Sequence, residues 1–392
     1  MLTFINGSYV SDDFLIKKGN VTIDGENIIS AGSGEVSGKT VDLNGNLLSP
    51  GFIDIHIHGA KKTDIMDGNA DSINRLAVFL ASTGTTSFFP TTVAADTESI
   101  LDAIQRVRKA SQKPQGASID GVHIEGPFVS SRRKGVFDPS FLRRPSTSEY
   151  DLFHDAAGSL KVRITAAPEL EGSAQFFRHV RMRGGCVSIG HSDGLEKDAI
   201  RGLENGANCF THLFNAMRGI HHREPGIAGA AIDSSAYTEL ICDGMHVVPT
   251  IVRMVFRARD PNLIALITDA MPAMGCGDGD YSFCGSSVHV KNGKVTEDDG
   301  TMAGSTLTMV NAVKNAERFA DISLAQAIRC ASLVPAKAAG IADRTGSITP
   351  GKRADLIVMD YGADIKEVYC RGKKIYDVQN GNNENDTDKK GV

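Results

Sequence analysis

The chain has 392 residues, of which 41% are hydrophobic and 23% charged, and its formal net charge is −5. This length suits a barrel of about 250 to 300 residues with a smaller module beside it, and the composition is that of a soluble globular protein. No basic excess favours nucleic acid as a partner, so an anionic ligand must be held by a local site.

Targeting and redox signals are weak. The first residues, MLTFINGSYV, lack the basic start and apolar core of a signal peptide, and no apolar run is long enough to span a bilayer. The seven cysteines are scattered without a C-x-x-C pair. We therefore expect a cytoplasmic protein with reduced thiols and no membrane partner.

Both ends of the chain have β character. Residues 1–49 alternate short β-like runs with Gly and Asn turns, and after residue 345 the β pattern returns in GSITPGKRADLIVMD and KEVYCRGKKIYDV. We expect residues 1–49 and 346–380 to form one small β-module. The polar, Gly- and Asn-rich end, 381–392, is expected to be disordered.

Between these ends, residues 50–345 alternate apolar strand-like runs with amphipathic helix-like stretches. The strand-like runs are FIDIHIHG, TTSFFPT, SIDGVHIEG, KVRITAAPE, CVSIGHSDG, ANCFTHLFN, YTELICDG and LIALITDAM. This rhythm predicts βα units and a parallel sheet, and the number of strands favours a closed α/β barrel over an open sheet.

Side chains of the metal-ligand type stand at the ends of five of these strands. They are His56 and His58, Glu125, His191, His212 and Asp269. Because the carboxyl ends of parallel barrel strands meet at one rim, we expect these side chains to lie around one point. His56 and His58 are two residues apart in a strand, so both imidazoles face the same way.

This set of residues predicts a metal centre. One carboxylate with two imidazoles, Glu125 with His191 and His212, suits Zn²⁺ or Fe²⁺. A metal lowers the pKa of bound water, and Asp269 beside it would accept a proton and return it to a leaving nitrogen. The alternatives are satisfied core or cap histidines and, for Asp269, a helix N-cap. His123 is expected in the interior and not as a ligand.

Several motifs make the prediction more specific. PGFIDIHIHG and GSITPGKRADLIVMD resemble the amidohydrolase superfamily. HIEGPF, GHSDG, THLFNAM, REPGIAGA, CDGMHV, TDAM and AGSTLTM, which occur in this order, resemble the N-acetylglucosamine-6-phosphate deacetylases within it. The resemblance runs from about residue 45 to residue 360.

The resemblance implies a TIM-like barrel with a β-sandwich built from both termini. It implies one or two divalent ions, zinc or iron, with Glu125, His191 and His212 as the main ligands and His56 and His58 as a second pair. It implies that Asp269 is the general base and then the acid, and that the enzyme is a homodimer whose phosphate arginine can come from the neighbouring subunit. The substrate would be a phosphorylated amino sugar, held by Asn215, Ala216 and Arg223 at the phosphate, His246 at the sugar, and Val136 and Leu307 at the pocket wall.

One position departs from the family pattern. Phe137, in KGVFDP, stands where relatives often carry a histidine that contacts the substrate. Either another group, such as His221 or His222, replaces that histidine, or the substrate differs.

Three alternatives follow. The sugar can be the galacto epimer. The enzyme can be a cyclic-amide hydrolase, although no lysine ends the strand VRITAAPEL. Finally, the chain can be a non-catalytic scaffold, although this alternative conflicts with a complete ligand set.

Overall fold

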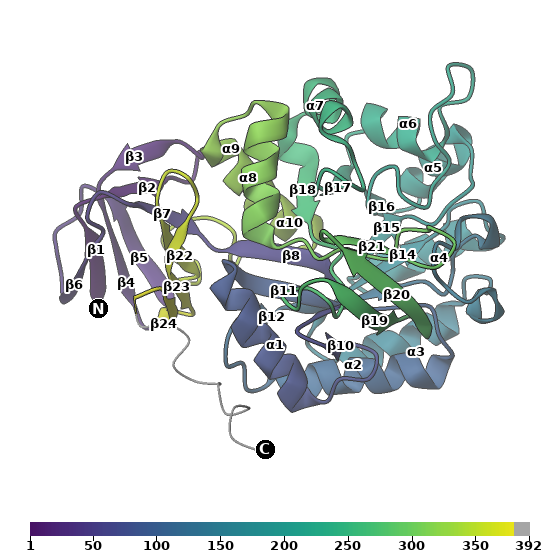
Figure 1. Ribbon diagram of the computed structural model, residues 1–392, viewed down its shortest axis with the longest axis horizontal. Coiled ribbons are helices and arrows are strands. Elements are labelled where there is room, and N and C mark those ends of the chain that lie inside the picture. The colour runs from purple at the N-terminus through teal and green to yellow at the C-terminus, as the bar shows by residue number, and fades with distance from the viewer. Residues whose placement is uncertain (380–392) are drawn as a thin grey trace.

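A parallel barrel forms the centre of the computed structural model, which describes residues 1–379 (Figure 1). Its strands are β8 (Phe52–Ile57), β11 (Thr85–Thr92), β13 (Gly121–Glu125), β14 (Lys161–Ala166), β15 (Cys186–Ile189), β16 (Ala207–Phe210), β17 (Tyr237–Ile241) and β18 (Ile264–Ile267). They pair in parallel in the order β8, β11, β13 through β18, and the short β12 (Ser118–Ile119) extends the pairing of β11. The α/β TIM-like barrel predicted from the sequence is confirmed.

The barrel closes between its first and last strands. The Asp269 amide donates to the carbonyl oxygen of His56 over 2.9 Å. Two residues before His56 in β8, the carboxylate of Asp54 accepts from the Thr268 hydroxyl over 2.5 Å and from the Thr268 amide over 3.3 Å. The closing contacts therefore lie next to residues at which the sequence predicts the active site.

Helices cover the outside of the barrel (Figure 1). They are α1 (Ala70–Ser82), α2 (Thr97–Ser111), α3 (Thr147–Ala157), α4 (Ser173–Met182), α5 (Glu196–Glu204), α6 (Gly226–Asp233), α7 (Pro249–Ala258), α8 (Met309–Ala320), α9 (Leu324–Ala331) and α10 (Leu333–Ala338), with 3-10 turns η1 (Ser131–Arg133), η2 (Pro139–Phe141) and η3 (Pro261–Leu263). Side chains at their starts satisfy free amides: Asn69 caps α1 and Asp96 caps α2. Within residues 1–379, no helix combines the length and the apolar character needed to cross a membrane.

Beside the barrel lie two sheets that enclose a core of their own. One has the order β5 (Asn27–Gly32), β4 (Asn20–Asp24), β1 (Leu2–Ile5), β6 (Lys39–Asp42); the other has the order β24 (Lys373–Asp377), β23 (Ile365–Cys370), β22 (Leu356–Met359), β7 (Leu47–Pro50), β2 (Ser8–Val10), β3 (Ile16–Lys18). Phe4 and Val21 from the first sheet pack with Leu48, Leu356 and Tyr369 from the second. Purple N-terminal and yellow C-terminal strands lie together in this module (Figure 1).

The β-sandwich made from both termini is thus confirmed as part of the fold. The boundaries at residues 49 and 346 stay a prediction. The expected disordered end, 381–392, lies outside the described residues. All seven cysteines are free thiols, as expected.

A small antiparallel lobe interrupts the βα rhythm and was not predicted. It consists of β19 (Gly279–Phe283), β20 (Ser286–Lys291) and β21 (Lys294–Thr296), between β18 and α8; a smaller hairpin, β9 (Gly59–Ala60) and β10 (Thr63–Asp64), follows β8. The lobe strands are half exposed and lie among Gly and Asp turns, so the sequence reads as a loop. Phe283 and Val288 nevertheless pack against Met271 and Ala303 near the barrel rim.

Candidate metal centre and active site

Glu125, the last residue of β13, lies at the centre of four imidazoles. Its Oε1 is 3.2 Å from His191 Nε2, 3.0 Å from His212 Nε2 and 3.3 Å from His56 Nε2, and its Oε2 is 3.1 Å from His58 Nε2. All five side chains are buried. The structure therefore brings together the five metal ligands expected from the sequence, in two groups that share Glu125.

The backbone at the strand ends is bent to aim these side chains inward. His191, His212 and Asp269 have φ angles of 47°, 29° and 50°, in the left-handed region that non-glycine residues seldom occupy. Such strain persists where the surroundings fix it, and it clusters at functional sites.

Hydrogen bonds on the far side of the rings indicate which nitrogen carries the proton. Nδ1–H of His191 donates to the carbonyl of Arg133 over 2.8 Å, Nδ1–H of His58 donates to the carbonyl of Thr91 over 3.2 Å, and Nδ1–H of His56 donates to Glu239 Oε2 over 3.0 Å. An Nδ1–H donor leaves the Nε2 lone pair free. All three lone pairs therefore point toward Glu125.

The electrostatics of the centre favour a cation. Burial opposes charge on the imidazoles, but Glu125, Asp269 and Glu239 outweigh it and raise the pKa of His56 well above its usual value. In the same way the pKa of His58 is raised to about 9 by Asp269 and Glu125 despite burial. Burial would raise the pKa of Glu125, but the imidazoles hold it well below its usual range.

These observations fit a divalent metal. Lone pairs of imidazole nitrogens converge on one carboxylate in a buried, electronegative place, and the ligand atoms of each group lie within 4.8 Å of one another. The rings of His56, His58 and His191 are held from behind by hydrogen bonds, as metal-ligating histidines usually are, whereas Nδ1 of His212 has no partner among the described residues. Nitrogen and oxygen ligands of this kind suit Zn²⁺ or Fe²⁺.

Asp269 lies beside the metal-ligand cluster, next to the rings of His56 and His58. Its Oδ1 is 3.4 Å from His56 Nε2 and 3.3 Å from His58 Nε2. Burial would raise its pKa, but the two imidazoles hold that pKa below its usual value. Asp269 thus lies where a proton acceptor for hydrolysis would stand.

Three buried residues below the centre complete it. His123 stacks edge-on against His56, with ring centroids 4.5 Å apart, and its Nε2 bonds to Thr165. Glu239 binds His56, and Arg163 from the opposite side of the barrel binds Glu239. Glu239 and Arg163 were not predicted, although a charged residue inside an apolar strand is a signal that could have pointed to both.

Apolar side chains wall the centre near the rim. Phe137 is buried and stacks on His191, with ring centroids 4.7 Å apart and the planes inclined at 27°. Phe283 of the lobe packs on His58 at 5.3 Å. Val136 packs in the same cluster as Phe137, and Leu307 is buried two residues after Ser305, whose amide donates to the carbonyl of Asp269.

The residues expected at the phosphate and the sugar occupy neighbouring loops. The Ala216 carbonyl accepts from the amide of Ser192 over 3.2 Å, so the loop that carries Asn215 and Ala216 lies beside His191. His246 follows β17 and bonds to Asp243 over 2.6 Å.

Arg223 is placed differently. It lies on an exposed loop with His221 and His222 and bonds to His222 over 2.7 Å. The two histidine rings contact each other at 4.2 Å, and both are exposed, whereas Phe137 is buried against His191. Their geometry gives no support to the idea that they replace a histidine at position 137.

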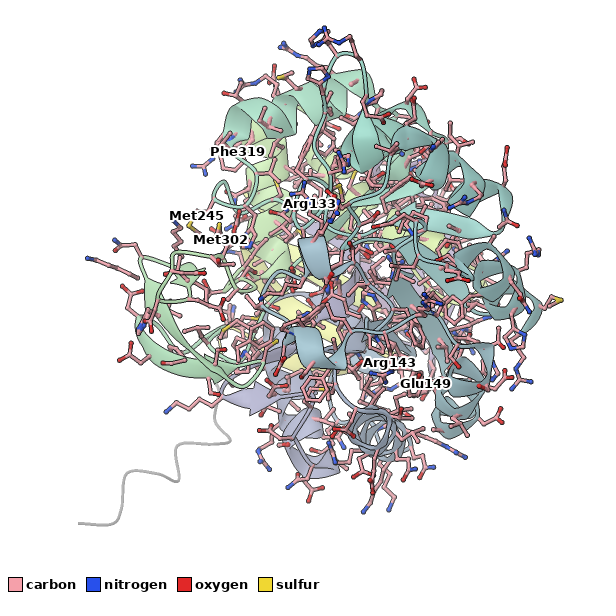
Figure 2. The ribbon with its side chains drawn as sticks, turned by 90° about the vertical axis from the view of Figure 1, so that its right-hand side faces the viewer. Arg133, Arg143, Glu149, Met245, Met302 and Phe319 are labelled. Atoms are coloured by element: carbon pink, nitrogen blue, oxygen red, sulfur yellow. The ribbon has the colours of Figure 1, made fainter. Side chains whose placement is uncertain are left out.

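Three arginines gather around one carboxylate beside these loops. Asp193 lies 2.9 Å from Arg133 Nε, 2.8 Å from Arg218 Nη2 and 3.5 Å from Arg132 Nη1. Arg133 lies in front of the barrel in Figure 2, in which Met245 and Met302 mark the edge next to the lobe. Glu169 lies beside this cluster, where its carboxylate accepts from the Asp193 amide and the Ser192 hydroxyl, so this part of the rim holds three guanidinium groups and two carboxylates. This cluster was not predicted.

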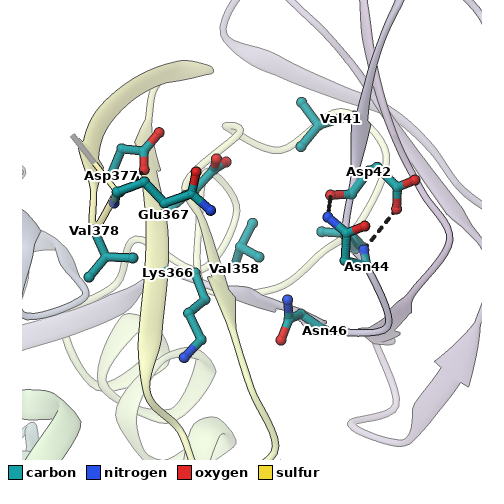
Figure 3. A pocket seen from close by; sticks show the side chains of 11 residues that line it. Val41, Asp42, Asn44, Asn46, Val358, Lys366, Glu367, Asp377 and Val378 are labelled. Carbon is teal, nitrogen blue, oxygen red and sulfur yellow. Dashed lines mark hydrogen bonds between the residues drawn. The ribbon is translucent and has the colours of Figure 1, made fainter.

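A separate cavity of about 290 Å³ opens in the β-module, between Asp42 and Asn44 on one side and Lys366 and Glu367 on the other (Figure 3). Its charged groups are engaged locally: Lys366 pairs with Asp360 and Glu367 with Lys374. The residues lining it do not include the histidines of the centre, so the chemistry of the chain points to the barrel rim.

Comparison with known proteins agrees with this geometry. Residues 47–391 match the model of the amidohydrolase family. The chain is 36% identical over 338 residues to an N-acetylgalactosamine-6-phosphate deacetylase of Escherichia coli O157:H7 (86% of this chain and 89% of that one), and 36% identical over 332 residues to an N-acetylglucosamine-6-phosphate deacetylase of Bacillus subtilis strain 168 (83% and 84%).

A solved structure is similar as well. It is a variant of N-acetyl-D-glucosamine-6-phosphate deacetylase from Mycobacterium smegmatis in complex with N-acetyl-D-glucosamine-6-phosphate, with a TM-score of 0.88, 29% identity, and coverage of 95% of this chain and 98% of that one. The chain therefore belongs to the amidohydrolase family, in the group that contains the amino-sugar 6-phosphate deacetylases, and is a hydrolase of an amide bond.

Proposed function

We propose that this enzyme hydrolyses the N-acetyl group of N-acetylglucosamine 6-phosphate and releases glucosamine 6-phosphate and acetate. The observation that carries the proposal is Glu125 in contact with four imidazoles, next to Asp269. The similarity to amino-sugar phosphate deacetylases supports the substrate class.

The centre is proposed to hold one or two divalent ions, zinc or iron. Glu125, His191 and His212 would hold the first, and His56 and His58, with Glu125 shared, the second. The ion supplies Lewis acidity, which activates water and polarises the acetyl carbonyl. The two groups share one carboxylate, so the ligand geometry accommodates either number of ions.

Asp269 is proposed to move the proton. It accepts a proton from the water whose oxygen bonds to the acetyl carbon, and it donates that proton to the sugar nitrogen as the carbon–nitrogen bond breaks. Its Oδ1 lies 3.4 Å from His56 Nε2 and 3.3 Å from His58 Nε2, so the carboxylate stands beside the proposed place of the ion and its water. The products are acetic acid and the free amine, and transfer of the acid's proton to the amine gives acetate and the protonated amine.

Substrate binding is assigned to the rim. Val136, Phe137 and Leu307 offer apolar surface next to the centre, which suits the acetyl methyl group. Asn215, Ala216 and His246 would contact the sugar phosphate. Arg133 and Arg218, on the same side as Ala216, support the binding of an anion.

Arg223 requires a partner to fulfil its expected role. It is exposed on a loop, so we propose that it reaches the phosphate of a neighbouring subunit in a homodimer. We also propose a cytoplasmic enzyme with no nucleic acid or membrane partner, in line with the near-balanced charge and the free cysteines.

N-acetylgalactosamine 6-phosphate, the galacto epimer, is the second candidate substrate. The N-acetylgalactosamine-6-phosphate deacetylase and the N-acetylglucosamine-6-phosphate deacetylase named above are both 36% identical to this chain. The test measures acetate release from N-acetylglucosamine 6-phosphate, its galacto epimer and unphosphorylated N-acetylglucosamine. We expect the highest kcat/KM for the gluco phosphate and a large loss without the phosphate. A preference for the galacto phosphate would replace the proposed substrate, and no release from any of the three would refute the proposal.

A further inference from the structure

Glu239 is a charged residue in the interior of strand β17, and it is fully buried. Its Oε2 accepts two hydrogen bonds, one from His56 Nδ1 over 3.0 Å and one from the backbone amide of His212 over 3.1 Å. These two residues belong to the two different ligand groups of the centre, which share Glu125. One carboxylate thus holds a member of each group from below.

The other oxygen of Glu239 is taken by Arg163. This arginine comes from β14, and its Nη2 donates to Glu239 Oε1 across the interior of the barrel. Arg163 is fully buried, and among the described residues its Nε and Nη1 have no hydrogen-bond partner. The guanidinium group therefore depends on Glu239 for its counter-charge.

We propose that Glu239, with Arg163 as its counter-ion, is the positioning residue of the metal centre, because it orients the His56 ring and fixes the backbone turn at His212. A hydrogen bond to Nδ1 keeps Nε2 of His56 as the free lone pair that faces Glu125. The second bond holds the turn at His212, whose φ of 29° is unusual for a residue with a side chain. The inference rests on the metal centre described under the proposed function, but not on the identity of the sugar.

The variants must separate positioning from folding. Removing Glu239 alone would leave Arg163 buried and uncompensated, which destabilises a protein strongly, whereas replacing both members of a buried ion pair by apolar groups is often tolerated. The informative protein is therefore the double variant Arg163→Met with Glu239→Leu. Its matched control is Arg163→Met with Glu239→Gln, which is equally uncharged but keeps an oxygen that can accept from His56 and His212.

The measurement is zinc affinity of the purified protein by competition with a chromophoric chelator, together with Tm in the absence of metal. We expect both doubles to fold, the leucine double to bind zinc about 10- to 100-fold more weakly than wild type, and the glutamine double to recover most of the affinity. Thr238→Val, next to Glu239 on the same strand, should bind zinc like wild type.

Zinc affinity in the leucine double that equals wild type, or equal losses in the two doubles, would overturn the positioning role. Should the leucine double not fold, Glu239→Asp keeps the charge opposite Arg163 but withdraws the acceptor by one methylene; unchanged zinc affinity there overturns the role as well. A wild-type protein without zinc affinity would refute the metal centre itself. Zinc binding without acetate release would refute only the proposed substrate.

Discussion

Asp269 differs from the other carboxylates of the centre in its access to solvent. Its side chain is 13% exposed, against 4% for Glu125 and 0% for Glu239. A group that exchanges a proton with water and substrate has to be reachable, whereas a ligand or a positioning group gains from burial. Exposure therefore supports a role for Asp269 that differs from the roles of the two buried carboxylates.

Asp269→Asn should retain zinc and the fold but lower kcat by about a hundredfold or more, since acid–base catalysis contributes about 10²–10⁴-fold. An amide keeps the size of the side chain and removes only the proton acceptor. The measurement is acetate release at saturating substrate, with metal content determined on the same sample. Asp298→Asn, at a position that is exposed on the lobe, serves as the control and should keep wild-type turnover; near-normal turnover in the Asp269 variant would remove its assigned role.

Single residues also explain what sequence reasoning found and missed. His191, His212 and Asp269 were predicted because each follows an apolar strand, where parallel topology brings side chains to one rim. Glu239 was missed because its partner His56 lies 183 positions earlier in the chain. Their strands, β17 and β8, come close only because the barrel closes, which leaves β18 alone between them. A strand pattern shows that Glu239 is unusual but does not show what it contacts.

At the scale of elements, the closing pair β8 and β18 links the fold to the chemistry. The Thr268 hydroxyl donates to the carboxylate of Asp54 on β8, and the backbone carbonyl of Thr268 accepts from the Ser305 hydroxyl over 2.6 Å. The residue that follows is Asp269. Any shift of β18 relative to β8 thus moves the proposed catalytic carboxylate.

Thr268→Val should lower the free energy of unfolding by about 1–3 kcal/mol, because it removes a donor from a buried carboxylate. It should also lower kcat/KM, because the end of β18 loses part of its anchoring. Urea unfolding and acetate release measure the two effects. Thr268→Ser keeps the hydroxyl and should preserve more of both, whereas a valine variant as stable and as active as wild type would contradict this account of the closure.

The βα units were predictable because each strand is a short apolar run that ends in a polar turn. The lobe β19–β21 was not, since most of its residues are exposed or half-buried and its strands lack the apolar run of the barrel strands. Its contribution is tertiary: Phe283 reaches His58. The part of Phe283 in the wall of the candidate pocket could therefore be recognised only from the structure.

At the scale of the whole molecule, arginines of the C-terminal part join the β-module to the barrel. Arg353 forms two hydrogen bonds to Asp120, over 2.9 Å and 2.6 Å, at the point between β12 and β13. Arg371 donates to the carbonyls of Pro114 and Gly116, just before β12. Since β13 ends in Glu125, the module is attached to the strand that carries the central ligand.

Asp120 makes this junction sensitive to acid. Burial would raise its pKa, but Arg353 outweighs burial and holds the pKa below its usual value of about 3.9. A carboxyl whose pKa is lower in the folded state stabilises the protein above the unfolded-state pKa, and this contribution is lost as the pH falls through the folded-state pKa. The contribution of the Asp120–Arg353 pair to the free energy of unfolding should therefore be complete at neutral pH and should decline below about pH 4.

Asp120→Asn should thus destabilise the protein by about 1–3 kcal/mol at neutral pH, because Arg353 loses one charged partner but keeps Asp355. The difference in unfolding free energy between wild type and variant should shrink as the pH falls below about 4, since wild type then loses the same charge. Urea unfolding of both proteins at a series of pH values measures this difference. A difference that stays constant down to about pH 3 would show that the charge of Asp120 does not hold the module to the barrel, and the attachment would then rest on Arg371 and on apolar packing.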